Sequence, residues 1–162
     1  MSLRPIITEG DPVLNKVCHP VTNFDQKLWD LLDDMHDTLA QSNGVGLAAP
    51  QVGILRRVAL VMNEENEVIE LINPVIVHTS GEQEGMEGCL SVPGKWGIVK
   101  RPFCVRVRAQ DRNGIEFEVE DVDLTARCFC HELEHLDGHL FSEHCDRLYT
   151  AEELDAIMSD KE

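Results

Sequence analysis

The chain has 162 residues, 43% of them hydrophobic and 27% charged, and its 14 basic and 30 acidic residues give a formal net charge of −16. This length fits one domain, residues 1–162, with a buried core, and the acidic balance argues against a general nucleic-acid binder, including direct DNA binding. No apolar run approaches the roughly 18 residues of a membrane span and residues 1–10 lack a signal-peptide pattern, so we expect a cytoplasmic protein without membrane contact.

The first predicted element is an amphipathic helix over residues 23–43. Asn23 is expected to cap its start, with Gln26 three residues on, and Gly44 is expected to end it. Apolar residues at helical spacing form one stripe along this helix: Phe24, Leu28, Leu31, Leu32, Met35 and Leu39. A loop rich in glycine and alanine, Gly44–Gly53, follows it.

Short β-type runs dominate the next part of the chain, at residues 57–62, 68–72, 74–78, 103–109 and 115–120. Two connections predict hairpins, Asn63–Asn66 and Asp111–Gly114, and the second contains the Asn-Gly pair that favours a tight turn. A second helix is predicted over 124–137, and a short acidic helix over 151–158 lies within the tail 151–162. A helix, then several hairpins, then a helix predict an α+β fold.

Residues 95–112 are basic, with a local net charge of +5, although the whole chain is acidic. Arg106 and Arg108 are two residues apart, so they share one face of a strand. The simpler interpretation is a solvated strand face that balances the acidic remainder. The alternative is a surface that faces an anion or RNA. The cations are Lys95, Lys100, Arg101, Arg106, Arg108 and Arg112.

Residues 131–135 read His-Glu-Leu-Glu-His, an H-E-x-x-H pattern inside the second predicted helix. Positions i and i+4 of a helix lie on one face, so the imidazoles of His131 and His135 can bind one metal ion. Glu132 can then reach a metal-bound water as general base. The alternative is a chance match with solvated histidines.

A catalytic metal site normally has a third protein ligand and an open position. Phe141 stands where the metzincin pattern requires its last histidine, which argues against that class. Glu152 or Glu153 would suit other zinc peptidases. Cys89, in the segment Glu87–Ser91, would complete a Cys/His₂ set, although a single cysteine is more often a buried thiol.

The other cysteines offer one further metal site, a structural one. Cys-x-Cys is not the usual zinc-binding spacing, and inside a helix Cys128 and Cys130 would point to different faces. In a reducing cytosol we expect all six cysteines to be thiols. This alternative set is Cys128, Cys130, His135 and Cys145.

Three blocks occur in order along the chain: Gly-Val-Gly-Leu-Ala-Ala-Pro-Gln at 44–51, Glu-Gly-Cys-Leu-Ser at 87–91 and His-Glu-Leu-Glu-His at 131–135. Together they resemble the peptide deformylase family, over nearly the whole chain. The resemblance implies a hydrolase of protein biosynthesis that processes the N-terminal methionine. It would remove the formyl group from formyl-methionyl nascent polypeptides and release formate. It also implies antiparallel hairpins and sheets packed around a central metal-binding helix, with an N-terminal amphipathic helix.

Residue by residue, the resemblance implies that Cys89, His131 and His135 bind one divalent metal ion. The family works with Fe²⁺ and tolerates Zn²⁺, Ni²⁺ or Co²⁺. Glu132 would be the general base and acid, and the Gln51 amide with the Leu90 N–H would stabilise the oxyanion. Cys89 and ferrous iron are both prone to oxidation. The implied substrate-binding residues are Gly44, Val45, Gly46, Glu87, Gly88, Leu124 and Cys128.

Three positions depart from the family pattern. Glu134 replaces an aspartate, Cys130 a glutamine, and Arg127 an aliphatic residue near the pocket, which leaves the substrate side-chain preference open. The acidic tail 151–162 lacks the longer basic helix through which some members dock to the ribosome. Residues 95–112 are the alternative route to a transient ribosome contact.

Two rival functions make different predictions. A zinc peptidase would cleave internal peptide bonds, would not depend on Cys89 and would need a downstream glutamate. A non-catalytic protein with a structural metal would keep its metal and its role after the substitution Glu132→Gln.

Overall fold

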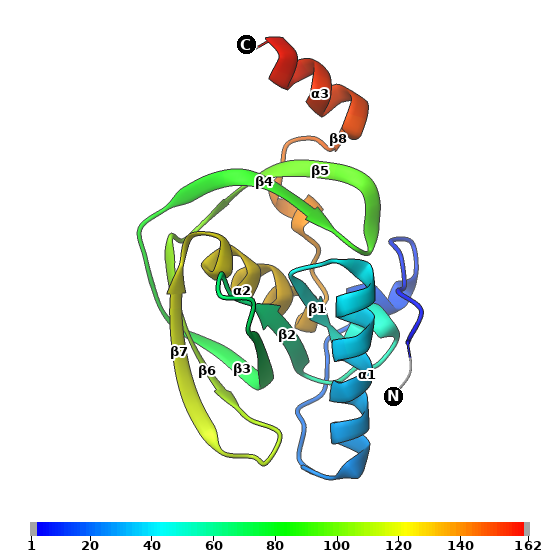
Figure 1. Cartoon of the computed structure of the whole chain (residues 1–162), viewed down its shortest axis with the longest axis vertical. Coiled ribbons are helices and arrows are strands. Elements are labelled where there is room, and N and C mark those ends of the chain that lie inside the picture. The colour runs from blue at the N-terminus through cyan, green and yellow to red at the C-terminus, as the bar shows by residue number, and fades with distance from the viewer. Residues whose placement is uncertain (1–2, 161–162) are drawn as a thin grey trace.

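The computed structural model describes residues 3–160, with side chains through residue 157, and shows a mixed helix and sheet fold (Figure 1). The helices are α1 (Gln26–Ser42), α2 (Asp123–Leu136) and α3 (Ala151–Asp160), with single 3₁₀ turns η1 (Pro12–Asn15), η2 (Ala49–Val52) and η3 (Phe141–His144). The strands are β1 (Gly46–Ala48), β2 (Val58–Met62), β3 (Val68–Ser80), β4 (Gln83–Cys89), β5 (Val92–Arg101), β6 (Cys104–Gln110), β7 (Glu116–Val122) and β8 (Tyr149–Thr150).

The strands form two antiparallel sheets around helix α2. The first has the order β1-β2-β3-β6-β7 and the second has the order β4-β5-β8. Figure 1 shows α2 enclosed between the larger sheet and the arch of β4 and β5, with α1 to one side and α3 projecting at the end of the chain. This arrangement confirms the predicted fold class, including the central helix and the N-terminal helix.

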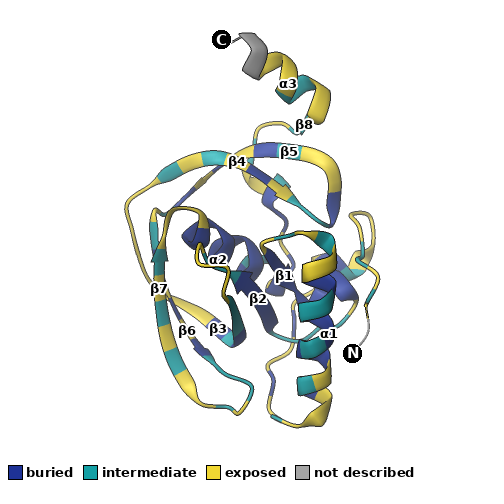
Figure 2. Ribbon diagram, in the orientation of Figure 1, coloured by how far each residue is buried: buried dark blue, intermediate teal, exposed yellow. Residues whose placement is uncertain are grey.

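Strand β2 is buried on both faces, which explains why its residues form a continuous apolar run. Successive side chains of a strand point to opposite faces, so Leu60 packs in the core cluster with Leu32 of α1. Its neighbour Val61 packs in the cluster that contains Phe129 of α2. The dark band at the centre of Figure 2 is this double-sided core. Helix α2 is therefore held rigidly against the sheet.

The predicted caps of α1 were wrong by a few residues. Asp25, not Asn23, caps the start, because its carboxylate accepts the backbone N–H of Leu28 at 3.2 Å. Asn43, not Gly44, ends the helix in the left-handed conformation, with φ of 57°. Asparagine tolerates that conformation better than most residues. The predicted boundaries of α2 and α3 agree with the structure within two residues.

Three of the five predicted strands match β2, β6 and β7 within two residues, and the other two were wrongly divided. Residues 68–72 and 74–78 form one continuous strand, β3, with a register shift around the left-handed Asn73. The Asn73 side chain compensates by bonding to both backbone groups of Val21, at 2.8 and 2.9 Å. The loop predicted at Gly44–Gly53 contains strand β1 and the turn η2.

Strands β4 and β5 were not predicted at all, because glycine and proline lower the β propensity of residues 83–101. Both predicted hairpins are present: they join β2 to β3 and β6 to β7. None of the helices within residues 3–160 combines the length and hydrophobicity that crossing a bilayer requires.

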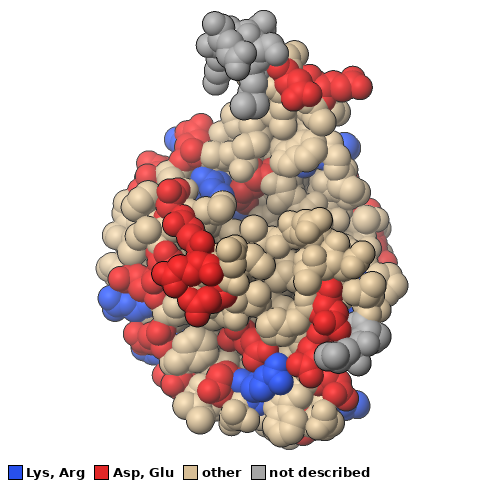
Figure 3. Space-filling model, in the orientation of Figure 1, with Lys and Arg blue, Asp and Glu red and all other residues tan. Residues whose placement is uncertain are grey.

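The cations of residues 95–112 do not form a separate basic surface. On β6, Arg106 and Arg108 pair with Glu120 and Glu118 of the neighbouring strand. Arg112 pairs with acidic side chains of α1 and β3, and Arg101 is buried. The simpler interpretation, a strand face balanced by acidic neighbours, is therefore the one that the structure supports. Figure 3 shows patches of acidic side chains and only scattered cations on the face in view.

Candidate metal centre

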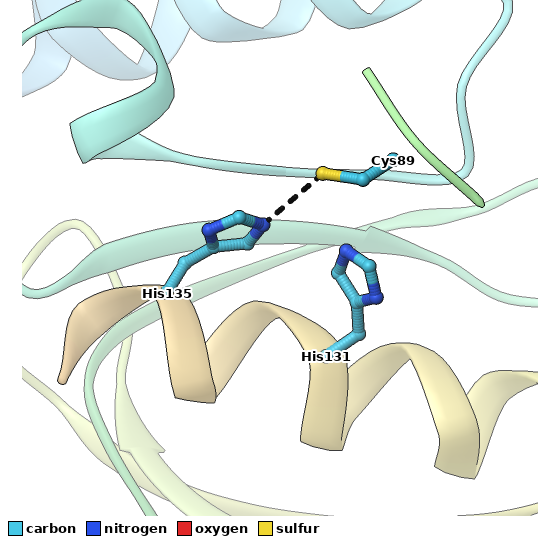
Figure 4. A group of neighbouring side chains, drawn as sticks. All are labelled: Cys89, His131 and His135. Atoms are coloured by element: carbon cyan, nitrogen blue, oxygen red, sulfur yellow. Dashed lines mark hydrogen bonds between the residues drawn. The ribbon is translucent and has the colours of Figure 1, made fainter. Parts of the chain in front are cut away.

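Three predicted ligands from two distant parts of the sequence meet in space. Cys89 ends strand β4, and His131 and His135 lie one turn apart on α2 (Figure 4). One ligand atom from each residue lies within 4.8 Å of the other two. The Cys89 Sγ and the His135 Nε2 are 3.4 Å apart. Strand β4 therefore supplies the third ligand that the helix alone could not.

This arrangement fits a divalent metal ion. Metal–sulfur bonds of about 2.3 Å and metal–nitrogen bonds of about 2.0–2.1 Å at a tetrahedral angle separate two ligand atoms by roughly 3.5 Å. The observed sulfur–nitrogen distance of 3.4 Å agrees with that geometry. Burial lowers the pKa of His135 to about 3, so its imidazole is in the neutral form that binds metals. A Cys/His₂ set leaves the fourth position for water or substrate.

Glu87 orients the ligand His131. Its carboxylate lies 3.0 Å from the His131 Nδ1, which directs the other ring nitrogen towards the site. The same carboxylate accepts two 3.0 Å hydrogen bonds from Arg101 and another from Arg127. Burial alone would raise the pKa of Glu87, but the hydrogen bonds from His131 and Arg101 lower it to about 2. Glu87 is therefore a buried, permanent anion behind the metal site.

Two of the departures from the family pattern belong to this buried network. Arg101 also contacts Glu134, and the second carboxylate oxygen of Glu134 contacts His144 of η3. Arg127 donates to the Val99 carbonyl at 3.0 Å as well as to Glu87. Two arginines thus face two glutamates, which balances the buried charge. The third departure, Cys130, packs in the apolar cluster between α2 and the larger sheet and lines a hollow together with Arg101 and Glu134.

Glu132 lies beside the three ligands and is nearly fully buried. Among the described residues, its Oε1 has no hydrogen-bond partner. Burial raises the pKa of Glu132 to about 7, against an opposing effect from His131. A carboxyl group with a pKa near neutrality can both accept and release a proton, which is the property of a general base and acid.

Gln51 presents its amide N–H group to the same site. Its Oε1 accepts the backbone N–H of Ala48 at 2.9 Å, which fixes the direction of the amide. Its Nε2 then points to the Cys89 Sγ at 3.6 Å and the Ser91 Oγ at 3.1 Å. Leu90 follows Cys89 in the turn between β4 and β5. Both predicted oxyanion residues are therefore next to the metal ligands.

A cavity of about 480 Å³ opens beside Cys89 and His131. All the predicted substrate-binding residues line it: Gly44, Val45, Gly46, Glu87, Gly88, Leu124 and Cys128. The sequence analysis missed several others, chiefly Met86, Pro93 and Trp96. They belong to β4 and β5, and recognising these strands as a hairpin around the Cys89 block would have indicated them.

The alternative metal sites are not formed. Within residues 3–160, the group of potential ligands close enough to share an ion is Cys89, His131 and His135. Cys128 lines the cavity and Cys130 does not, although both pack in the apolar cluster between α2 and the larger sheet. Glu153 forms an ion pair with Arg147 and does not belong to this group of potential ligands. Phe141 stacks on the ring of His131, with centroids 5.7 Å apart.

Comparison with known proteins decides the family. The family model described as "Polypeptide deformylase" matches residues 3–151. The chain belongs to the polypeptide deformylase family. A peptide deformylase of Agathobacter rectalis is 54% identical over 88% of this chain and 90% of its own length. Peptide deformylase 1 of Bacillus subtilis is 46% identical over 95% of this chain and 97% of its own length.

Solved deformylase structures share the fold. The peptide deformylase of Legionella pneumophila matches with a TM-score of 0.85 and 38% identity, over 98% of this chain and 97% of that one. The peptide deformylase of Thermotoga maritima matches with a TM-score of 0.86 and 36% identity, over 90% and 99%. These matches confirm the predicted family, the fold and the deformylase activity, and they identify the chain as a metalloenzyme.

Proposed function

We propose that the cavity beside Cys89 and His131 binds formyl-methionyl peptides and that Glu132 drives the hydrolysis of their formyl group. The observation that carries this proposal is the Oε1 of Glu132, which is buried beside the three ligands without a partner among the described residues. A buried carboxylate oxygen without a protein partner is costly, so such atoms concentrate where a substrate or water completes the contact.

Cys89, His131 and His135 would hold one divalent ion, and we propose Fe²⁺, with Zn²⁺, Ni²⁺ or Co²⁺ as substitutes. Thiolate and imidazole ligands suit all four of these ions. When bound, the ion supplies Lewis-acid activation of water and of the formyl carbonyl. Metal analysis of protein purified without oxygen, followed by reconstitution of the metal-free chain with each ion, tests this choice.

The chain's own groups then move the proton and stabilise charge. Glu132 takes the proton of the attacking water and later delivers it to the nitrogen of the leaving amine, so that formate and a free amino terminus result. As negative charge develops on the formyl oxygen, the Gln51 Nε2–H and the Leu90 N–H donate hydrogen bonds to it. The bond between Gln51 and the Ala48 N–H keeps the amide in the orientation that this role requires.

The cavity lining favours a formylated methionine. Leu124 and Cys128 provide an apolar wall for the methionine side chain, and Val45 lies at the rim, 44% exposed. Arg127 also lines the cavity, but its Nη1 donates to Glu87 and to the carbonyls of Gly85 and Val99, so its charge is balanced without the substrate. The peptide would lie along the loop Gly44–Gly46 as an added strand.

The decisive test is formate release from a formyl-Met peptide by Fe²⁺-loaded protein purified without oxygen. We expect rapid release by the native chain and loss of activity in Glu132→Gln, with one metal ion still bound per chain. Glu64→Gln, in the exposed hairpin between β2 and β3, is the matched control and should retain full activity. A metal-loaded native chain that releases no formate would contradict the proposal, as would an active Glu132→Gln.

We infer one catalytic domain over residues 1–162 that acts in the cytoplasm on nascent formyl-Met polypeptides. A transient ribosome contact stays a prediction. The cations of residues 95–112 give little support to a ribosome contact, because most of them pair with acidic neighbours. Co-sedimentation of the chain with translating ribosomes at low and moderate salt tests this contact.

A further inference from the structure

The turn η3, which follows α2, packs beside the metal site. Its first residue, Phe141, is buried and lies in one apolar cluster with the ligand Cys89. The Phe141 ring also stacks on the ring of the ligand His131, with centroids 5.7 Å apart and an angle of 21° between the ring planes. A stacked aromatic neighbour at this distance restricts the tilt of the imidazole. Phe141 therefore supports one metal ligand directly.

The last residue of η3, His144, is connected to the same ligand through three charged side chains. The His144 Nε2 contacts one carboxylate oxygen of Glu134, and the other oxygen contacts Arg101. Arg101 donates two hydrogen bonds of 3.0 Å to Glu87, whose carboxylate lies 3.0 Å from the His131 Nδ1. The chain of contacts begins at an exposed side chain and ends at a buried metal ligand. Each member limits the positions that the next one can take.

The turn itself is fixed on both sides. Within it, the Glu143 carboxylate accepts the backbone N–H of Leu140 at 3.0 Å. The next residue after the turn, Cys145, lies against the α-carbon of Gly97 of β5, where a Cβ would be 2.5 Å from the Cys145 Sγ. Further along, β8 pairs with β5. The turn is therefore a firm support for the side chains of α2.

We propose that Phe141 and His144 are positioning residues that hold His131 in place for the metal ion. Phe141 fixes the plane of the ring. His144 acts through the charged side chains, which fix the direction of the ring nitrogens. A ligand held in one orientation loses less freedom when the metal binds, so both residues should slow the release of the metal. The proposal rests on the proposed function, because it takes Cys89, His131 and His135 as the metal ligands.

The test measures how fast the metal leaves the Zn²⁺-loaded protein when a chelator is added in excess. We expect His144→Ala to release Zn²⁺ about 10-fold faster than the native chain, the lower end of the usual loss of metal affinity when a group behind a ligand is removed. His144→Gln, whose amide can still donate to Glu134, should restore most of the native rate. Phe141→Leu keeps an apolar side chain in the cluster but removes the flat ring, so it should also accelerate release.

His36→Ala is the matched control for His144→Ala. The His36 and Glu70 side chains form a similar pair, 33% and 18% exposed, compared with 44% and 23% for His144 and Glu134. The contacts of Glu70 continue to Arg112 instead of a metal ligand. We therefore expect a comparable loss in the urea midpoint from both substitutions, but His36→Ala should release Zn²⁺ at the native rate.

The Co²⁺-loaded protein gives a second readout that does not depend on activity. The visible absorption of a bound Co²⁺ ion depends on the geometry of its ligands. His144→Ala and Phe141→Leu should shift these bands, whereas His36→Ala should not. A double variant of His144→Ala and Glu134→Ala should release Zn²⁺ no faster than Glu134→Ala alone, because both substitutions break the same chain of contacts.

Three results would overturn the positioning roles. The first is a native release rate and a native Co²⁺ spectrum in both His144→Ala and Phe141→Leu. The second is an equal acceleration of release by His36→Ala, which would indicate a general effect of stability. The third is an additive effect in the double variant, which would show that His144 does not act through Glu134. A native chain that binds no metal through the three ligands would instead contradict the proposed function, and the positioning roles with it.

Discussion

The α-carbon of Gly46 lies directly against the carboxylate of Glu132. A Cβ at position 46 would be 2.4 Å from the Glu132 Oε2 and 2.9 Å from its Cδ, closer than real side chains approach. Gly46 of the first sequence block thus leaves room for Glu132 of the third block, the proposed general base. The resemblance implied only a substrate-binding role for Gly46, and the structure adds this steric reason for a glycine.

Gly46→Ala should therefore disable catalysis by displacing Glu132. We expect kcat to fall at least about 100-fold, the usual contribution of a general base, with metal content unchanged. Gly44→Ala should lose less, because its Cβ would meet only the flexible ends of Leu90 and Leu39, at 3.0 and 3.3 Å. Steady-state formate release by both variants checks the ranking. Equal losses would contradict the stated role of Gly46.

Gln51→Glu removes one hydrogen-bond donor with almost no change of shape. The new side chain can still accept the Ala48 N–H, but a buried carboxylate beside Cys89 costs free energy, so stability should fall as well. The group facing the formyl oxygen would become an acceptor, and we expect kcat to fall about 10²–10³-fold. Comparing kcat with the urea midpoint separates the two effects. A loss of stability without a loss of kcat would show that Gln51 is purely structural.

Glu87→Gln should be one of the most destabilising single substitutions in the chain. It leaves Arg101 and Arg127 buried with one anion fewer, which costs about 3–5 kcal/mol. It also weakens the hold on His131, so metal affinity should fall about 10–100-fold. Urea unfolding and competition with a chelator measure the two losses. Glu118→Gln, in an exposed pair with Arg108, should cost less than about 1 kcal/mol.

Glu70 should make stability depend on pH in the acid range. Burial would raise its pKa, but hydrogen bonds from His36 and Arg112 lower it to about 2 from the ordinary 4.5. A pKa that is lower in the folded state stabilises the protein above pH 4.5, and this contribution disappears as the pH falls towards 2. We expect it to be on the order of 2 kcal/mol at neutral pH.

Urea unfolding of the metal-free chain at pH 7 and pH 3 checks this linkage without interference from metal release. The native chain should lose more stability between these pH values than Glu70→Gln does. Parallel pH profiles for the two proteins would show that Glu70 is not the titrating group.

Exposure to air should inactivate the Fe²⁺ form faster than the Zn²⁺ or Ni²⁺ forms. Ferrous iron and the Cys89 thiolate can both be oxidised, and each oxidation removes part of the metal site. Activity followed over hours in air, with mass spectrometry of the Cys89 peptide, measures the loss. Cys130, which is buried away from the cavity, serves as an internal control thiol. Equal decay of all three metal forms would contradict the redox explanation.

Elements whose signals are local were predictable from the amino-acid sequence. The apolar stripe of α1 and the two turn sequences depend on neighbouring residues, so both hairpins and the helix were predicted correctly. The His131 and His135 pair was predictable for the same reason, since i and i+4 share a helix face in any context. Cys89 was different: spacing alone did not join it to the helix, and only the resemblance to deformylases indicated it as a ligand.

Tertiary structure decided what depends on contacts between distant segments. Strands β4 and β5 have weak β propensity, and pairing with each other and with β8 makes them strands. The partners of Glu134, the charge balance around Glu87 and the place of Trp96 over Gly88 depend on the register of that pairing and on the position of α2. Local sequence specifies which residues can bind a metal or a proton. Only the packed chain fixes which of them lie within 3 to 5 Å of one another, because those distances are set by sheet register and helix packing.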